Sequence, residues 1–193
     1  MKIRNKRGIT LVELIIAMAL TVMILAASTA MINPLYSFYG DSLKKAKAIK
    51  VSGLIEKRLK EIVPSMDNEV FVATSVLSHS GTDYWYIYNE SNIVKLRFNN
   101  TQKEFLETAD YQGFNVEMSI HAKRKSLGAS YDTYYRILVF TIKVKYGSDV
   151  LITRNVSIYL NLLTGSETIK VNGGATPVET TAYKSVKFKA NLE

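Results

Sequence analysis

The first 32 residues constrain the chain more than any other segment. The segment begins with four basic residues, Lys2, Arg4, Lys6 and Arg7. Gly8 follows, and from Ile9 to Ile32 the sequence is almost wholly apolar, with Glu13 as its only charge. At about 1.5 Å per residue, a helix over 9–32 would span roughly 36 Å, whereas a hydrocarbon core is about 30 Å thick. The segment therefore predicts a membrane-spanning helix with its basic end in the cytoplasm.

Glu13 is the unusual residue of this segment. A carboxylate in a membrane span costs about 2.5–3.5 kcal/mol near the bilayer centre and less toward its edge, so such residues mark functional sites by default. A plain transmembrane anchor leaves Glu13 unexplained, unless its side chain merely reaches the interface. Cleavage as a secretory signal after Ala26-Ala27-Ser28 is a further alternative, but the apolar run is longer than the usual 7–15 residues.

The sequence Lys6-Arg7-Gly8-Ile9-Thr10-Leu11-Val12-Glu13-Leu14-Ile15 closely resembles the processing site of type IV prepilins and pseudopilins. In that family a membrane-embedded aspartic peptidase cuts after the glycine that ends a short basic leader, and the new N-terminal residue is N-methylated. The resemblance implies cleavage between Gly8 and Ile9, methylation of Ile9, and Glu13 as the acidic residue of the mature helix. Ile9 stands where the family most often has phenylalanine, which fits a minor subunit better than an abundant one.

The resemblance also implies a role for Glu13 in filament assembly. Cleavage would expose an α-amine, and a carboxylate one helical turn away could pair with the amine of a neighbouring subunit. A mispositioned subunit would leave Glu13 uncompensated, so the carboxylate would set the register of assembly. The implied partners are other pilin subunits, the prepilin peptidase and an inner-membrane assembly platform. The implied location is the cytoplasmic membrane, single-pass with an extracytoplasmic C-terminal domain, and then an extracellular filament.

Composition limits the remaining function classes. The net charge is +8, and loss of the leader would reduce it to +4, so much of the basicity is a topology signal and nucleic-acid binding is only weakly supported. The chain has no cysteine, which excludes disulfides, thiolate metal sites and a cysteine nucleophile. At 193 residues there is room for one domain beyond the anchor.

Helical periodicity continues beyond the apolar run, despite Pro34, which should kink the helix. One apolar stripe consists of Val51, Leu54, Ile55, Leu59 and Ile62. The lysines between these positions are expected to form a solvated face of the helix. The alternative is that this face contacts phosphate groups. Gly53 weakens the helix by about 1 kcal/mol relative to alanine but could permit close packing. Pro64 ends the pattern.

From Glu69 onward the period changes to two, which indicates strands. Alternating apolar sets predict strands over 114–121, 138–146 and 150–162, with a hairpin turn at 147–149, and a second hairpin joins 84–88 to 93–98. We therefore expect an α+β fold in which a long N-terminal helix packs against an antiparallel sheet, as in type IV pilins. The expected division is a leader at 1–8, a membrane or filament-core helix at 9–32, its amphipathic continuation at 33–64, a sheet domain at 65–163 and an irregular, exposed tail at 164–193. Within that tail, Val186 and Phe188 could form a short edge strand.

No residues predict catalysis, a metal or a cofactor. His79 and His121 have no carboxylate or cysteine at metal-ligand spacing, and no phosphate-binding loop or nucleophile motif occurs. Aromatic residues with nearby cations could stack bases or sugars: Tyr84–Tyr88, Tyr131, Tyr134 and Tyr135, with Lys95, Arg97 and Lys123–Lys125. Alternation places Tyr84, Tyr86 and Tyr88 on one face, so ordinary sheet packing is the favoured interpretation.

These features predict a minor pilin or pseudopilin, loosely similar to the J-class pseudopilins and W-class minor pilins, which are thought to form filament-priming tip complexes. Two alternatives stay open. One is a single-pass surface protein that binds a ligand without joining a filament, and the other is a DNA-capture subunit. Pilus, secretion pseudopilus and DNA-uptake pilus are not separated by these residues.

Overall fold

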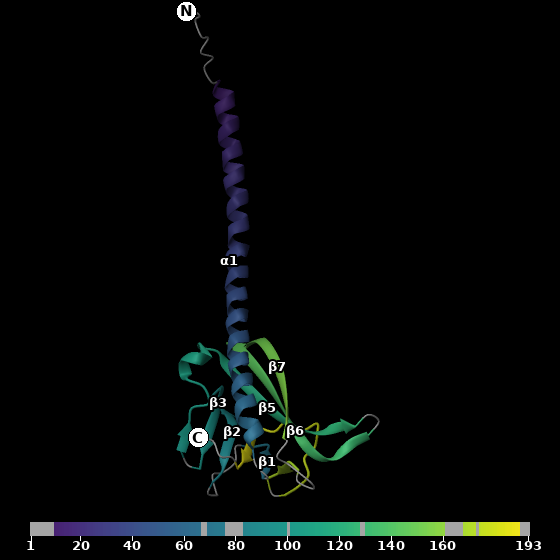
Figure 1. Ribbon diagram of the computed structural model, residues 1–193. Helices are drawn as coiled ribbons and strands as arrows, with labels where there is room; N and C mark the ends of the chain where they lie inside the picture. The colour runs from purple at the N-terminus through teal and green to yellow at the C-terminus, as the bar shows by residue number, and fades with distance from the viewer. Residues whose placement is uncertain are drawn as a thin grey trace, which may run out of the picture. The chain divides into compact units, whose positions relative to one another are not determined.

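The computed structural model describes residues 10–66, 69–75, 83–99, 101–127, 130–160, 168–172 and 174–189. Its fold is α+β, as predicted: a long N-terminal helix is followed by antiparallel-rich sheets (Figure 1). The chain divides into two compact units, Met1–Lys44 and Lys45–Glu193.

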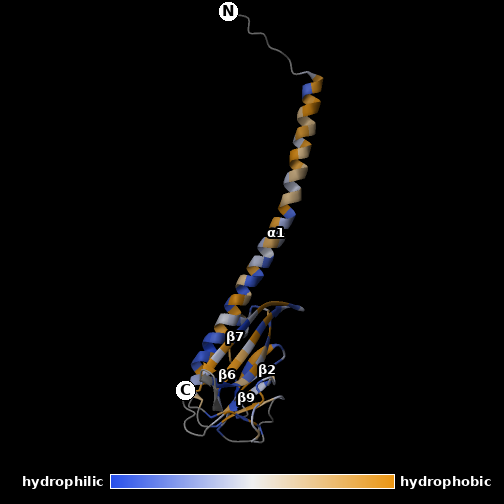
Figure 2. Cartoon of the chain, turned by 90° about the vertical axis from the view of Figure 1, so that its right-hand side faces the viewer, coloured by the Kyte–Doolittle hydropathy of each residue, from blue (hydrophilic) through white to orange (hydrophobic). Residues whose placement is uncertain are grey.

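The described part of the first unit is helical and apolar. Helix α1 runs from Leu11 to Ile62, beyond the end of this unit, and continues through Pro34. Proline lacks the amide hydrogen that would bond to the carbonyl one turn earlier, so the helix tolerates one missing bond there. In Figure 2 the first part of α1 is coloured mostly as hydrophobic, with a few hydrophilic positions between.

The last part of α1 belongs to the second unit and is amphipathic. Its buried positions are Ala48, Val51, Ser52, Ile55, Leu59 and Ile62. The predicted stripe is therefore confirmed at four positions, while Leu54 is only half-buried. A short 3-10 helix, η1 (Val63–Ser65), contains Pro64 and ends the helical segment.

A six-stranded sheet has the strand order β4-β3-β2-β9-β1-β8. The strands are β1 (Val70–Ala73), β2 (Trp85–Glu90), β3 (Ile93–Phe98), β4 (Thr101–Lys103), β8 (Lys170–Val171) and β9 (Ser185–Phe188). All pairs are antiparallel except β1 with β8. The predicted edge strand at Val186 and Phe188 is wrong in its position, because β9 lies between β2 and β1 and both side chains are fully buried. The C-terminal region is thus not merely irregular but supplies two strands.

A separate three-stranded sheet has the order β5-β6-β7 and follows η2 (Thr108–Tyr111). Its strands are β5 (Asn115–Leu127), β6 (Ser130–Tyr146) and β7 (Asp149–Tyr159). The predicted alternation is confirmed on β5 and β6 by buried side chains at Val116, Ile120, Phe140, Ile142 and Val144. Tyr146 and Val150 were predicted to be on the apolar faces of their strands but are 52 % and 49 % exposed, and both lie beside the turn at the end of the hairpin. On β7 the register also shifts there, which leaves Leu151 unpaired beside Val150. Leu162 lies outside the described residues.

Both predicted hairpins are present. The β2–β3 turn is shorter than the expected connection over 89–92: Glu90 pairs with Ile93, and Ser91 and Asn92 have φ values of 53° and 62°. Two left-handed residues are typical of a type I′ turn, whose twist matches that of the strands. In the β6–β7 turn, Gly147 has a φ of 61°, where a side chain would be strained.

The helix and both sheets of the second unit share one hydrophobic core. That cluster joins Ile55 and Leu59 of α1 to Phe140 of β6, Ile87 of β2 and Phe188 of β9. An ion pair reinforces the contact between α1 and β7: Arg154 Nη1 lies 2.6 Å from Glu56 Oε2, and Lys60 Nζ lies 2.6 Å from Glu56 Oε1. The contact does not require glycine at position 53, since a Cβ there would lie 3.8 Å from Arg154 Nη1, an ordinary contact distance.

Candidate functional site at the start of the N-terminal helix

Thr10 and Glu13 form a reciprocal cap at the start of α1. The Glu13 amide donates to Thr10 Oγ1 at 3.3 Å, and the Thr10 amide donates to Glu13 Oε2 at 2.9 Å. The Thr10 hydroxyl also donates to Glu13 Oε2, at 3.0 Å. This is the capping-box arrangement, in which two amides that lack intrahelical acceptors are satisfied by side chains.

The cap explains how a carboxylate is tolerated in an apolar segment. The N-terminal end of a helix carries a partial positive charge, so an anionic group in its first turn is stabilised there. Both hydrogen bonds from Thr10 go to Oε2, and none is recorded to Oε1 from the residues that the structure describes. Thr10 was not predicted as a site residue, although a threonine three positions before a glutamate is the ordinary signal for this cap.

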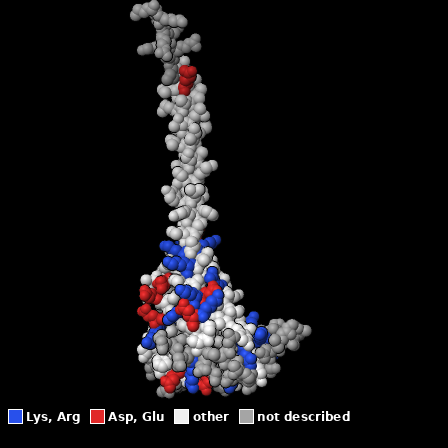
Figure 3. Space-filling model, viewed as in Figure 1, with Lys and Arg blue, Asp and Glu red and all other residues white. Residues whose placement is uncertain are grey.

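The surface of the helix beyond Glu13 is apolar and open. Large hydrophobic side chains from Leu11 to Leu43 are 45–75 % exposed in the single chain. Hydroxyl groups in this stretch donate to carbonyls of the preceding turn: Thr21 to Ala17 at 2.8 Å, and Ser28 to Ile24 at 2.8 Å. Figure 3 shows one acidic residue near the N-terminal end of the helix and an uncharged surface along its apolar part. By length and composition α1 is able to cross a membrane.

The predicted cleavage and methylation residues, Gly8 and Ile9, lie outside the described residues, as does the basic leader. Their roles therefore stay predictions. Glu13 is described and lies in the first turn of α1, while its role in setting register also stays a prediction.

The aromatic residues of β2 do not form an open stacking surface. Tyr86 and Tyr88 are 1 % and 2 % exposed and pack with Ala73 in a second hydrophobic cluster, which supports the sheet-packing interpretation. Tyr84 is half-buried, with Lys187 Nζ 3.9 Å from its ring centre. Its hydroxyl donates to Glu69, and this hydrogen bond lowers the pKa of the Glu69 carboxyl and raises the pKa of Tyr84.

The other predicted residues lie in two places: Lys95 and Arg97 are on β3, which pairs with β2, whereas Lys123–Lys125, Tyr134 and Tyr135 are on the β5–β6 hairpin. The Arg124 guanidinium lies 5.5 Å from the ring centre of Tyr135 and bonds to Glu179 at 3.0 Å. Lys125 lies 5.4 Å from the ring centre of Tyr159 on β7. Lys95 of β3 instead pairs with Glu90 at 2.6 Å. The candidate residues thus divide between two places and do not form one stacking site.

The two histidines form no metal site among the residues that the structure describes. His121 is half-buried on β5, and His79 and the side chain of Tyr131 lie outside the described part. Among the described residues, no group of three or more histidine, cysteine, aspartate or glutamate side chains is arranged to hold a metal ion.

Comparisons with known proteins point to the same N-terminal segment. The family model of the prokaryotic N-terminal methylation motif matches residues 3–29, which include Gly8, Ile9, Thr10 and Glu13. The chain therefore carries a type IV prepilin-like signal. A comparison with curated proteins found no significant match, and a comparison with solved structures found none either.

Proposed function

We propose that this chain is a minor subunit of a type IV pilus-like filament. In this proposal the chain is inserted in the cytoplasmic membrane with residues 1–8 inside and its C-terminal domain outside. Prepilin peptidase then removes the leader after Gly8, and Ile9 becomes the methylated N-terminus. The processed subunit joins other pilin subunits through α1, in an initiation or tip complex.

One observation carries this proposal: the methylation motif at 3–29 coincides with the start of an apolar helix whose side chains have no cover in the single chain. Such a large exposed apolar surface requires a lipid or protein environment. A lipid bilayer covers it before assembly, and neighbouring helices would cover it in a filament. The same surface therefore serves both stages of the proposed pathway.

In this proposal Glu13 sets the axial position of each subunit relative to its neighbours in the filament. Its carboxylate lies one turn from the amine that cleavage at Ile9 would create, and the amine of a neighbouring subunit would neutralise it where water is excluded. Because an unpaired charge is costly in that setting, a subunit at the wrong height would be disfavoured. The role is structural, and no catalytic step is assigned to the chain.

Processing is tested by the intact mass of the full chain, isolated from membranes of cells that contain a prepilin peptidase. We expect the wild-type chain to lack residues 1–8 and to carry one added methyl group. Gly8→Leu should keep the leader, because the bulky side chain occupies the position before the cut. Asn5→Leu is the matched control, since it places the same side chain within the leader, and it should be processed normally.

Three results would contradict the proposal. The wild-type chain could keep residues 1–8, as expected of a plain single-pass surface protein. Gly8→Leu could be cut at the same bond as the wild-type chain. Cleavage after Ala27 or Ser28 would instead indicate an ordinary secretory signal.

A further inference from the structure

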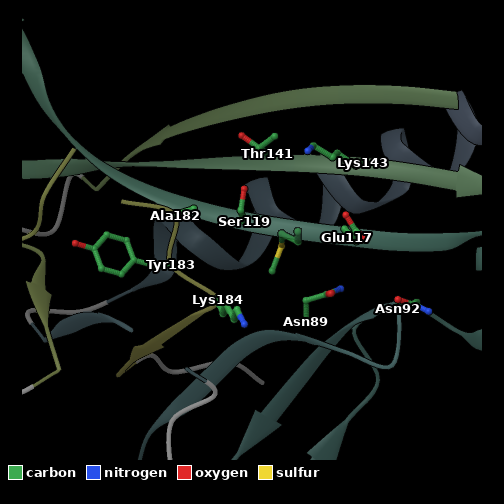
Figure 4. A pocket seen from close by; sticks show the side chains of 10 residues that line it. Asn89, Asn92, Glu117, Ser119, Thr141, Lys143, Ala182, Tyr183 and Lys184 are labelled. Carbon is green, nitrogen blue, oxygen red and sulfur yellow. The ribbon is translucent and has the colours of Figure 1, made fainter. Parts of the chain in front are cut away.

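A polar cleft of ≈ 470 Å³ lies between the two sheets of the second unit (Figure 4). Its walls come from the end of β2 and the following turn, from β5 and β6, and from the connection that precedes β9. The residues that line it include Asn89, Met118, Ser119, Thr141, Lys143 and Lys184. A cleft of this size is within the range of small-ligand sites.

The backbone of Met118 has unused hydrogen-bonding groups that face this cleft. The amides of Val116 and Ile120 point away from β6, donating to the carbonyls of Asn92 at 2.6 Å and Tyr183 at 2.9 Å. Alternate residues of a strand direct their backbone groups to the same side, so Met118 presents its amide and carbonyl between these two contacts. Met118 is 5 % exposed, and no partner of this amide or carbonyl is recorded among the described residues. Buried backbone groups require a partner, and water or a ligand in the cleft would supply one.

Side chains add acceptors and hydroxyls to the same cleft. The Asn89 amide nitrogen donates to the carbonyls of Ile93 at 3.0 Å and Val116 at 2.8 Å. These two bonds fix the orientation of the amide, which leaves Asn89 Oδ1 as an acceptor without a described donor. Ser119 and Thr141 are paired across β5 and β6, so their hydroxyls lie side by side on the cleft side of the sheet.

The charges of the cleft favour an anion. Glu117 is the only acidic residue of the lining, and Lys145 already pairs with it. Lys143 and Lys184 also line the cleft; Glu117 lies opposite Lys143 across the two strands but forms its ion pair with Lys145, and neither Lys143 nor Lys184 forms one with a residue that the structure describes. Two cations are therefore available to a ligand, while the one carboxylate is compensated.

We propose that the cleft binds an acidic sugar residue, a hexuronate or a similar carboxylated saccharide. Its carboxylate would lie between Lys143 and Lys184, and its hydroxyls would donate to the Met118 carbonyl and Asn89 Oδ1 while accepting from the Met118 amide. A neutral sugar leaves both lysines without a counter-charge, and an inorganic phosphate has too few donors for the acceptors. An extended peptide is disfavoured because Asn92 and Tyr183 occupy the edge of β5 on both sides of Met118. This inference does not rest on the filament role proposed above.

The test uses the full chain in a mild detergent and ligand-observed NMR titration with D-glucuronate. D-glucose, inorganic phosphate and a triglutamate peptide are the comparison probes. We expect glucuronate to bind about tenfold more tightly than any of the three, since charge-assisted and neutral hydrogen bonds must act together. Lys143→Gln/Lys184→Gln should weaken glucuronate binding at least about tenfold. Lys170→Gln is the matched control, because it removes a lysine from β8, outside the cleft.

Unchanged thermal unfolding of the double variant would show that any loss of binding is local. The inference is overturned if glucuronate does not bind, if the double variant binds it as well as the wild-type chain, or if Lys170→Gln weakens it equally. Equal affinity for phosphate would show a general anion site, and tighter binding of triglutamate would show a peptide site. Either outcome would overturn the saccharide assignment.

Discussion

Phe188 offers the sharpest test of the C-terminal strand, because its side chain lies in the core shared by the helix and both sheets. Its side chain is 0 % exposed, and its backbone pairs with Trp85 on one side and Val70 on the other. The perturbation is Phe188→Ala. It removes a large aromatic side chain from the core without changing the charge of the chain.

The expected cost is large relative to the stability of a domain. Truncating a buried phenylalanine to alanine costs about 3–5 kcal/mol, from lost transfer free energy and from the cavity that remains. The free energy of unfolding of an ordinary domain is about 5–15 kcal/mol. The variant should therefore lose between about a fifth and all of its stability, which lowers the ratio of folded to unfolded chains by about 10²–10⁴. A side chain exposed on the surface would lose much less.

The chain contains a natural reporter for this measurement. Trp85 is the single tryptophan, it is 7 % exposed, and its ring centre lies 4.7 Å from that of Phe98. Its fluorescence should change when the six-stranded sheet opens. We would follow urea unfolding of the full chain in a mild detergent by this signal, for the wild-type chain and the variant.

Val178→Ala is the control, since Val178 lies in the same C-terminal region but is 55 % exposed. It should change the free energy of unfolding by no more than about 0.5 kcal/mol. If Phe188→Ala also stays within about 1 kcal/mol of the wild-type chain, the full burial of Phe188 in the core is wrong. An equal loss in both variants would contradict the reasoning as well, because burial would then not determine the cost.

Two further predictions concern glutamates. Glu13→Gln should keep the helix cap, because glutamine also fits a capping box, but should reduce incorporation into sheared filaments, measured by immunoblot against the membrane fraction. Thr10→Ala should cost about 1 kcal/mol of local helix stability, but the variant should still be incorporated into filaments. If Thr10→Ala reduced incorporation more than Glu13→Gln did, Glu13 would act only as a cap. Hydrogen bonds from Lys60 and Arg154 lower the pKa of Glu56, so its contribution to stability is present above the unfolded pKa of about 4.3 and is lost as pH falls through the folded pKa. Below about pH 4 the wild-type urea midpoint should fall more steeply than that of Glu56→Gln, and parallel curves would contradict this linkage.

The elements predicted best from sequence are those whose pattern is long and local. The buried stripe of α1 and the alternation of β5 and β6 each extend over several periods, so burial on one face shows directly in the residue types. Errors occur where the backbone leaves its regular period. Tyr146 and Val150 follow the alternation in sequence, but both lie at the end of the hairpin, where the sheet leaves them half exposed, and a register shift on β7 lies beside Val150.

The position of β9 was not predictable from its own residues. Ser185–Phe188 is a short run, and the residues on either side of it say nothing about which strands it joins. Whether a strand lies at the edge or the centre depends on partners far along the chain, here β1 and β2. The cleft has the same origin, because Asn89, Met118 and Lys184 come together only when the two sheets meet. By contrast, the Thr10 cap was predictable from local spacing alone.

The cap and the proposed register role of Glu13 are compatible because a carboxylate has two oxygens. Thr10 uses only Oε2, through its amide and its hydroxyl. In a monomer within the membrane, these bonds and the helix dipole offset part of the cost of about 2.5–3.5 kcal/mol for a carboxylate in lipid. Oε1 would then accept a hydrogen bond from the α-amine of a neighbouring subunit, and the cap would stay intact. Assembly would therefore add a charge-assisted bond to a carboxylate already held in one orientation, so little side-chain entropy would be lost when the subunits pair.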